Sequence, residues 1–316
     1  MKQATGISER IKSNIVDPDT LPKDIRKISY SQYSTYKECP HRWYLKYAKK
    51  HFPFSQSIDT VFGTAMHETL QKYLELLFNT SIKAATDFKI LTYLKERLVY
   101  NYSQEFINNN EEDFATPEQL KMYFEDGVEI IKYIKRKRKI LFDNKNYELV
   151  GIELPVLTEI IPGNDNIVFQ GFIDVVIRDK TNGRITIIDI KTSKSGWKDE
   201  FEKRDQKKID QILLYKRFFS QQFNIPIEDI DVIFFIVKRK INQDSEFPIP
   251  RVQQFKPANG KLKINQAVTN LHKFLHECYS YEGAPIEKKY RTNPGDEQKN
   301  CKFCPFKDKP ELCNKR

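Results

Sequence analysis

Two acidic residues and one lysine stand out within otherwise apolar sequence. Asp174 lies in GFIDVV, and Asp189 and Lys191 lie in IIDIK. Carboxylates bind hard cations such as Mg²⁺ or Mn²⁺, and a lysine beside a metal-bound water can assist hydrolysis. The alternative is a salt-bridged patch on a solvated sheet face, because charge clusters point to function only statistically.

The spacing of these residues predicts that they share one face of a hairpin. We expect its two strands over residues 172–178 and 184–190. Asn182-Gly183 between them is typical of a two-residue turn. That turn would place Asp174 opposite Lys191 and Asp189 opposite Val176, and opposed residues point to the same face. A four-residue loop would preserve this arrangement, whereas a three-residue loop without a bulge would destroy it.

Other segments supply the elements that must hold this hairpin. Apolar and alternating patterns predict further strands over residues 147–160, 231–238 and 251–256. Helical periodicity predicts helices over 84–108, 117–141, 204–223 and 261–281. Another helix should begin within Gly63–Glu68, with Thr64 as its N-cap, after a loop over 51–59. The order indicates an α/β fold. We divide it into a loosely ordered leader (1–28), a helical lobe (29–146), a core (147–284) and a cysteine-rich tail (285–316).

Composition favours a globular protein with anionic partners. The 316 residues include 53 Lys+Arg and 43 Asp+Glu, which gives a net charge of +10. Such a balance suits nucleic acid, although many basic proteins bind none. We find no membrane span and no signal peptide in Met1–Asp24. We therefore expect a cytoplasmic protein without membrane partners, or one acting in a host cytoplasm if a phage encodes it.

Three of the five cysteines gather near the C-terminus. Cys301, Cys304 and Cys313 fall within 13 residues, and CxxC spacing brings two thiolates to one metal. The best candidate for a fourth ligand is Cys39 in YKECP, because Cys278 lies in an amphipathic helix and reads as a buried thiol. Spacing does not separate zinc from an iron–sulfur cluster, and reduced thiols without metal are the alternative.

Aromatic and basic residues between Ser29 and Lys50 allow two interpretations. We expect one helix from a Ser31 cap to Cys39 and another starting at Pro40. Tyrosines at helical spacing are more often core than a stacking surface for nucleic acid. The five-cation run Lys135–Lys139 is most simply a solvated helix end, or it contacts phosphates. Candidate DNA contacts are Ser31, Tyr36, Arg42, Lys135 and Arg136.

Six motifs in order carry a family resemblance from Ser29 to Cys313. They are Ser29, Ser31, Tyr36, Cys39 and Pro40; Gly63, Thr64, His67 and Leu70; GFIDVV with Asp174; DIK with Asp189 and Lys191; Gln211 and Tyr215, one helical turn apart; and the CxxC tail. Together they resemble the PD-(D/E)XK nuclease superfamily. The similarity is to its RecB-like branch with an iron–sulfur cluster, which includes the AddB nuclease domain and the CRISPR-associated four-cysteine exonucleases.

The resemblance implies a role for each matched residue. The fold would be a central mixed sheet of the restriction-endonuclease-like type, flanked by helices. Lys191 would position or deprotonate the attacking water, and Gln211 and Tyr215 would orient Lys191 or touch the DNA backbone. The ligands of Mg²⁺ or Mn²⁺ would be His67, Asp174, Asp189 and the carbonyl of Ile190. The 4Fe–4S ligands would be Cys39, Cys301, Cys304 and Cys313.

Two features depart from that simple pattern. The gap between Cys304 and Cys313 is longer than in many relatives, which weakens the assignment of Cys313. Glu153, on the strand before the hairpin, is either an additional acid or a solvated side chain.

The resemblance implies a metal-dependent DNA exonuclease acting on single strands or ends. Recombination, repair, replication and phage DNA metabolism are all open. One alternative is a DNA-binding or adaptor subunit with a vestigial site, and another is a zinc-stabilised, structure-specific endonuclease. The chain has no GxxxxGK[ST] motif, so we expect any helicase or recombination partner to be a separate protein.

Overall fold

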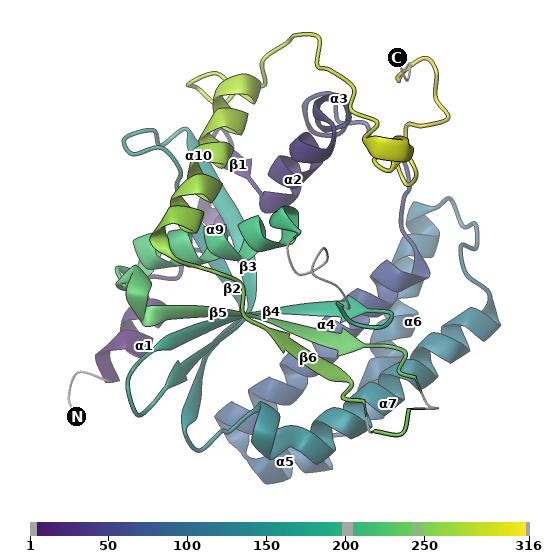
Figure 1. The fold of residues 1–316 in the computed structure, drawn as a ribbon, viewed down its shortest axis with the longest axis vertical. Coiled ribbons are helices and arrows are strands. Elements are labelled where there is room, and N and C mark those ends of the chain that lie inside the picture. Colours follow the sequence, from purple (N-terminus) through teal and green to yellow (C-terminus); the bar gives the residue numbers. More distant parts are fainter. Residues whose placement is uncertain (1–4, 198–204, 243–244, 248, 314–316) are drawn as a thin grey trace.

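A mixed sheet between two layers of helices forms the centre of the molecule (Figure 1). The computed structural model describes residues 5–197, 205–242, 245–247 and 249–313. The strands are β1 (Arg26–Ile28), β2 (Tyr147–Glu159), β3 (Ile167–Asp179), β4 (Ile185–Ser193), β5 (Ile230–Lys238) and β6 (Val252–Phe255). They run in the order β1-β3-β4-β5-β6, with β2 also paired to β3. The predicted α/β class with a central mixed sheet is confirmed.

Strand β3 is shared between three neighbours. Along one edge it pairs with β2 over most of its length, antiparallel. Along the other edge its downstream part, Val175–Arg178, pairs antiparallel with β4, and its upstream part, Ile167–Phe169, pairs parallel with β1. The pairing with β4 stops at Val175 and Ile188, so the next residues outward, Asp174 and Asp189, do not form a main-chain pair with each other.

The hairpin turn differs from the prediction in its length. Arg178 pairs with Ile185, and the next residue outward, Asp179, donates its main-chain N–H to the carbonyl of Arg184 across a four-residue loop. Val176 therefore lies opposite Ile187, not Asp189, and the predicted two-residue turn is wrong. A side-chain hydrogen bond stabilises the longer loop, because the carboxylate of Asp179 accepts the main-chain N–H of Thr181. The register moves by two residues, so the predicted sharing of one face survives.

Four helices cover one face of the sheet (Figure 1). They are α4 (Ile58–Glu75), α5 (Ile82–Asp87), α6 (Ile90–Asn108) and α7 (Pro117–Leu141). Helix α7 has the predicted bounds because Thr116 and Gln119 form a capping box before it. Helix α4 begins earlier than predicted. Its N-cap is Ser57 rather than Thr64, and Ile58, Val61 and Phe62 extend its buried stripe.

Helices α9 (Gln206–Phe223) and α10 (Lys261–Cys278) cover the opposite face. Aromatic side chains of α9 fill the space beneath it, and Phe218 stacks on Phe169 of β3 with ring centroids 4.4 Å apart. Helix α9 thus lies directly on the strand that carries Asp174.

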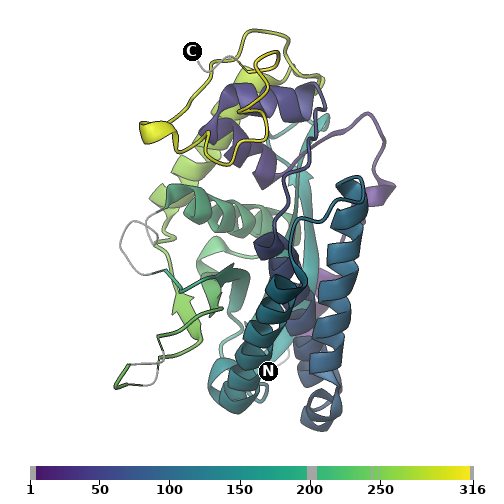
Figure 2. The same ribbon diagram turned by 90° about the vertical axis from the view of Figure 1, so that its right-hand side faces the viewer.

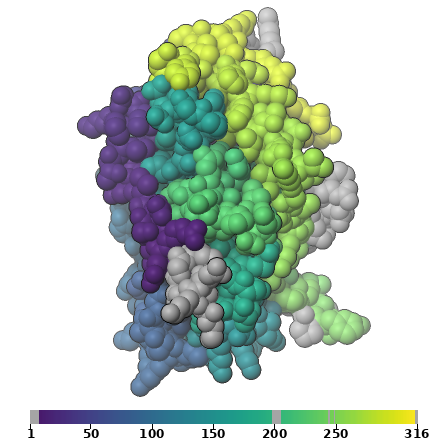
Figure 3. All heavy atoms as spheres, turned by 90° about the vertical axis from the view of Figure 1, so that its left-hand side faces the viewer, coloured from purple at the N-terminus to yellow at the C-terminus, as the bar shows by residue number. Residues whose placement is uncertain are grey.

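Helices α2 (Tyr30–Glu38) and α3 (Pro40–Trp43) lie with the C-terminal tail at one end of the molecule (Figure 2). Trp43 of α3 is fully buried, and its ring meets Phe274 of α10 edge-on. The segment predicted as a loosely ordered leader holds helix α1 (Thr5–Ser13) and strand β1. It runs along one side of the molecule (Figure 3), where Asn14 accepts a hydrogen bond from Gln222 of α9.

A buried ion-pair network fastens α7 to the end of β5. Asp126 of α7 accepts from Arg239 at 3.1 Å and from Lys240 at 2.8 Å. The side chains of Asp126 and Arg239 are only 11% and 9% exposed. Arg239 also stacks on the ring of Tyr123, 3.9 Å from its centroid. Breaking this network would leave a guanidinium buried without its main partner.

We therefore predict that Asp126→Ala lowers the free energy of unfolding by about 3–5 kcal/mol, the usual cost of an uncompensated buried charge. Urea denaturation measures it. The control is Glu129→Ala on the same helix, because Glu129 pairs with Lys132 in solvent. Its loss should cost no more than about 1 kcal/mol. Equal losses for the two variants would contradict the assigned role of Asp126.

Candidate active site

The two acidic residues of the hairpin lie where the pairing of β3 with β4 ends. Asp174 directly precedes Val175, and Asp189 directly follows Ile188, the last paired residues. Beyond the last main-chain pair, the carboxylate of Asp174 serves as the acceptor instead, since its Oδ2 accepts the main-chain N–H of Ile190 at 2.6 Å. Asp189 is 3% exposed. The end of the ladder thus gathers two carboxylates in a largely buried place.

Lys191 lies beside Asp189 and connects the hairpin to α9. Its Nζ is 2.9 Å from Asp189 Oδ2 and 3.2 Å from Oδ1. The same ammonium donates to Oε1 of Gln211 at 3.1 Å. Gln211 in turn approaches the hydroxyl of Tyr215, one helical turn later, at 3.5 Å. The predicted meeting of Asp189, Lys191, Gln211 and Tyr215 is therefore present in the structure.

His67 approaches the carboxylates from α4. Its Nδ1 lies 3.7 Å from Oδ2 of Asp174, which is too long for a hydrogen bond but within ion-pair range. The main chain of Ile190 also interacts with His67. Helices from both faces of the sheet, α4 and α9, thus bring side chains to one point at the end of the β3–β4 pairing.

The protonation states reflect burial and crowding of like charges. Burial raises the pKa of Asp174, and the neighbouring Asp189 raises it further. Burial, with the positive charge of Lys191, lowers the pKa of His67 to about 4. For Lys191, burial opposes the charged form, but Asp189 and Asp174 prevail and raise its pKa. Near neutral pH, His67 is thus a neutral imidazole and Lys191 an ammonium.

These donors suit a hard divalent cation. Oδ2 of Asp189 is buried and accepts no well-oriented hydrogen bond, although Lys191 is near. A cation would use that oxygen and would relieve the repulsion between the two carboxylates. As the side chains stand, no three His, Cys, Asp or Glu residues in the described part of the chain are arranged to hold a metal ion.

Two further polar residues lie around Asp174: Gln71, which sequence reasoning did not single out, and Glu153, which it left as either an additional acid or a solvated side chain. Gln71 of α4 donates to the carbonyl of Asp174 at 3.3 Å and to Oε1 of Glu153 at 2.5 Å. Gln71 follows His67 by four residues, so the shared helix face was the signal for it. Glu153 is exposed, and its φ of 45° is left-handed within a strand, a strained conformation that often accompanies function.

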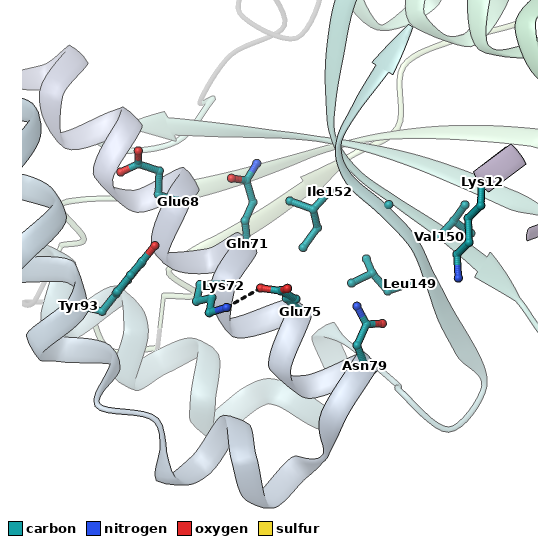
Figure 4. Close-up of a pocket in the computed structure, with 11 residues that line it drawn as sticks. Lys12, Glu68, Gln71, Lys72, Glu75, Asn79, Tyr93, Leu149, Val150 and Ile152 are labelled. Atoms are coloured by element: carbon teal, nitrogen blue, oxygen red, sulfur yellow. Dashed lines mark hydrogen bonds and ion pairs between the residues drawn. The ribbon is translucent and has the colours of Figure 1, made fainter. Parts of the chain in front are cut away.

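A polar cavity of about 540 Å³ continues from these residues along α4 and β2 (Figure 4). Gln71 and Glu68 of α4 lie at its edge, and main chain around Gly151 of β2 forms the other side. Lys72 and Glu75 pair with each other across one turn. The cavity shares Gln71 with the carboxylate group, whereas His67, Asp174, Asp189 and Lys191 do not line it.

The cysteines predicted to act together do gather in space. Cys39, Cys301, Cys304 and Cys313 line one small cavity between α3 and the tail. Main-chain N–H of Asn293 lies 3.4 Å from the sulfur of Cys39, and Asn300 donates to the carbonyl of Glu38. Cys278 is buried away from them in α10, as predicted, and burial raises the pKa of its thiol.

The predicted DNA-contact residues are dispersed. Tyr36 packs edge-on against Trp43, and its hydroxyl donates to Glu277, so protein contacts engage this side chain. Arg42 pairs with Glu38 one turn away. Ser31 is exposed on α2. Lys135 donates to the carbonyl of Thr86 and Arg136 lies over Tyr133 on α7. None of these side chains touches the carboxylate group.

Comparison with known proteins places the chain in a family. The model of the PD-(D/E)XK nuclease superfamily matches residues 27–309, and the chain belongs to that superfamily. Membership implies a nuclease, and such nucleases generally use divalent metals. Among solved structures the chain is similar to one described as "Crystal structure of SSO0001", at 15% identity over 99% of this chain and 100% of that chain, with a TM-score of 0.34. No curated protein matches.

No helix among the described residues has the length and apolar character needed to cross a bilayer.

Gly171 of β3 leaves room for the ring of Tyr215. A Cβ there would lie 2.5 Å from Cε1 of this buried ring. We predict that Gly171→Ala costs about 1–3 kcal/mol of stability, because overpacking forces side chains or backbone to move. Thermal unfolding measures it. Gly260→Ser is the control, since a Cβ at Gly260 meets nothing within 4 Å. An unchanged Gly171→Ala protein would contradict this close packing.

Proposed function

We propose that the protein is a metal-dependent DNA exonuclease that hydrolyses phosphodiester bonds at single strands or ends. The observation that carries the proposal is the cluster of Asp174, Asp189 and Lys191, with His67 beside it, in which Asp189 is buried and the other three side chains are partly buried. Four charged or ionisable side chains from three elements would be a costly arrangement if its only role were structural. The superfamily supplies the reaction class, and the RecB-like branch with its exonuclease members fits the ordered motifs.

The metal ligands in this proposal are His67, Asp174, Asp189 and the carbonyl of Ile190. One imidazole with oxygen donors favours Mg²⁺ or Mn²⁺ over thiolate-seeking metals. When bound, the cation would supply charge neutralisation at the phosphate and would lower the pKa of water. His67 is suited to ligation because its lowered pKa keeps the imidazole neutral at physiological pH.

Lys191 is the residue that we assign to the attacking water and to the charge that develops at phosphorus. Gln211 holds its ammonium from the α9 side, and Asp189 holds it from the hairpin side. Lys191 Nζ thus lies between acceptors on the hairpin and on α9, which fix the direction of the ammonium group. Tyr215 lies behind Gln211 and limits its movement.

We further propose that Cys39, Cys301, Cys304 and Cys313 hold a 4Fe–4S cluster, with zinc as the alternative occupant. Their common cavity supports one centre, and iron clusters are commonly held by four cysteines. Such a centre would join α3 to the tail and would serve stability.

The central prediction concerns Lys191. With Mg²⁺ or Mn²⁺, the wild type should degrade linear single-stranded DNA, and Lys191→Ala should be slower by about 10²–10⁴-fold, the usual contribution of a positioned acid or base. The assay follows 5′- and 3′-labelled substrates, with and without EDTA. Lys180→Ala, at the opposite end of the same hairpin, is the control and should retain activity.

Two outcomes of that assay count against the proposal. Equal rates for wild type and Lys191→Ala would remove the assigned mechanism. Cleavage of circular single-stranded DNA at the rate of linear DNA would identify an endonuclease, because an exonuclease requires an end.

A separate prediction concerns the metal bound by the four cysteines. Protein purified without oxygen should be brown and contain iron and acid-labile sulfide. Cys39→Ser should lose the colour and unfold at a lower temperature, because metal-binding energy is also folding energy. Cys278→Ser, which changes a cysteine outside the shared cavity, should stay brown. Stoichiometric zinc without iron would overturn the cluster assignment.

A further inference from the structure

Besides Asp174 and Asp189, a further carboxylate lies buried next to the proposed active site. Asp210 of α9 has no exposed surface. Its Oδ2 accepts from Lys37 at 2.8 Å and from the hydroxyl of Tyr33 at 3.3 Å, and its Oδ1 accepts from Gln206 at 2.5 Å. A fully buried charge is tolerated only with such partners. Two of the three come from α2, so Asp210 is a fixed point between α2 and α9.

The contact between α2 and α9 is polar apart from tyrosine rings. Tyr30, Tyr33 and Lys37 form one stripe of α2 and all face the first turns of α9. Tyr30 donates to the carbonyl of Lys207, and Lys207 pairs with Glu38 at 2.8 Å. Only Tyr30 and Tyr33 of α2 are buried. Directional bonds, with Asp210 at their centre, therefore join the start of α9 to α2, while Ile212, Leu213 and Leu214 pack in the core.

Asp210 is adjacent in sequence to Gln211, the residue that holds Lys191. Consecutive helical residues point about 100° apart, so Asp210 faces α2 while Gln211 faces the hairpin. The 3.1 Å contact from Lys191 to Gln211 therefore depends on where Asp210 anchors this turn. A shift of the turn by a fraction of an ångström would lengthen that contact beyond hydrogen-bond range.

We infer that Asp210 is a positioning residue for the nuclease reaction: its bonds to Lys37 and Tyr33 of α2 hold Gln211 at the distance at which it orients Lys191. The inference rests on the proposed function. It makes the docking of α2 a determinant of turnover rather than of substrate binding, because the affected contact is to Lys191.

The test is a double-mutant cycle between Asp210 and Gln211 with the full chain, Mn²⁺ and linear single-stranded DNA. Asp210→Asn keeps the side-chain shape and removes the charge. We expect kcat to fall about tenfold with KM unchanged, since small misplacements at a reacting centre have effects of this size. In a Gln211→Ala background the same change should have no further effect, because Asp210 acts through Gln211.

The control is Glu277→Gln. Glu277 accepts from Tyr36 and thus ties the same helix α2 to α10 instead of α9, so its kcat should stay within about twofold. If Asp210→Asn does not fold, Tyr33→Phe takes its place, since it keeps the carboxylate and its ion pair with Lys37 and removes one hydroxyl donor. It should show the same loss of kcat and the same dependence on Gln211.

Each result bears on one claim. Wild-type kcat in Asp210→Asn, a change in KM alone, or losses that multiply with Gln211→Ala would overturn the inference while the nuclease function stands. A wild-type protein that leaves DNA intact with Mg²⁺ and Mn²⁺ would overturn the proposed function, and the inference with it. A tenfold loss of kcat that vanishes in the Gln211→Ala background supports the inference.

Discussion

The repulsion between two buried carboxylates is the constraint around which this fold is arranged. Asp174 and Asp189 meet at the end of a strand ladder, where water cannot screen them and the pKa of Asp174 rises. The chain offsets that repulsion with one ammonium, Lys191, and one main-chain donor, from Ile190. Oδ2 of Asp189 accepts no well-oriented hydrogen bond, although Lys191 lies 2.9 Å away, and it is the atom that a bound cation would use.

The surrounding elements keep this unfavourable group in place. Helix α4 closes it from one face through His67 and Gln71, and α9 closes it from the other through Gln211. The pairing of β3 with β4 ends just before Asp174 and Asp189, and Asp174 accepts the main-chain N–H of Ile190 there instead. The site thus lies where the ladder ends, between the two helices.

The fold class could be predicted from the order of the expected helices and strands. The gathering of the hairpin residues could be predicted because side chains alternate between the two faces of a strand, so that a register shift of two residues leaves each on its face. The loop has four residues instead of two, yet Asp174, Asp189 and Lys191 still share a face. The loop length itself depends on bonds such as that from Thr181 to Asp179, which compete with the Asn-Gly signal. Asp210 was out of reach, because its role arises from burial between α2 and α9, which are far apart in sequence. For Gln71 the sequence offered only its place on the helix face of His67, and its contacts with Asp174 and Glu153 come from the tertiary fold.

Strand β1 gives the protein a vulnerability of its own. Its three residues pair with Ile167–Phe169 of β3, along the edge where β4 no longer pairs, and thereby satisfy main-chain groups upstream of Asp174. A chain shortened past Ile28 would present Ile167–Phe169 as an open edge, apolar and ready to accept any extended segment. Loss of the N-terminal segment would thus promote aggregation through this edge before it harmed the catalytic residues themselves.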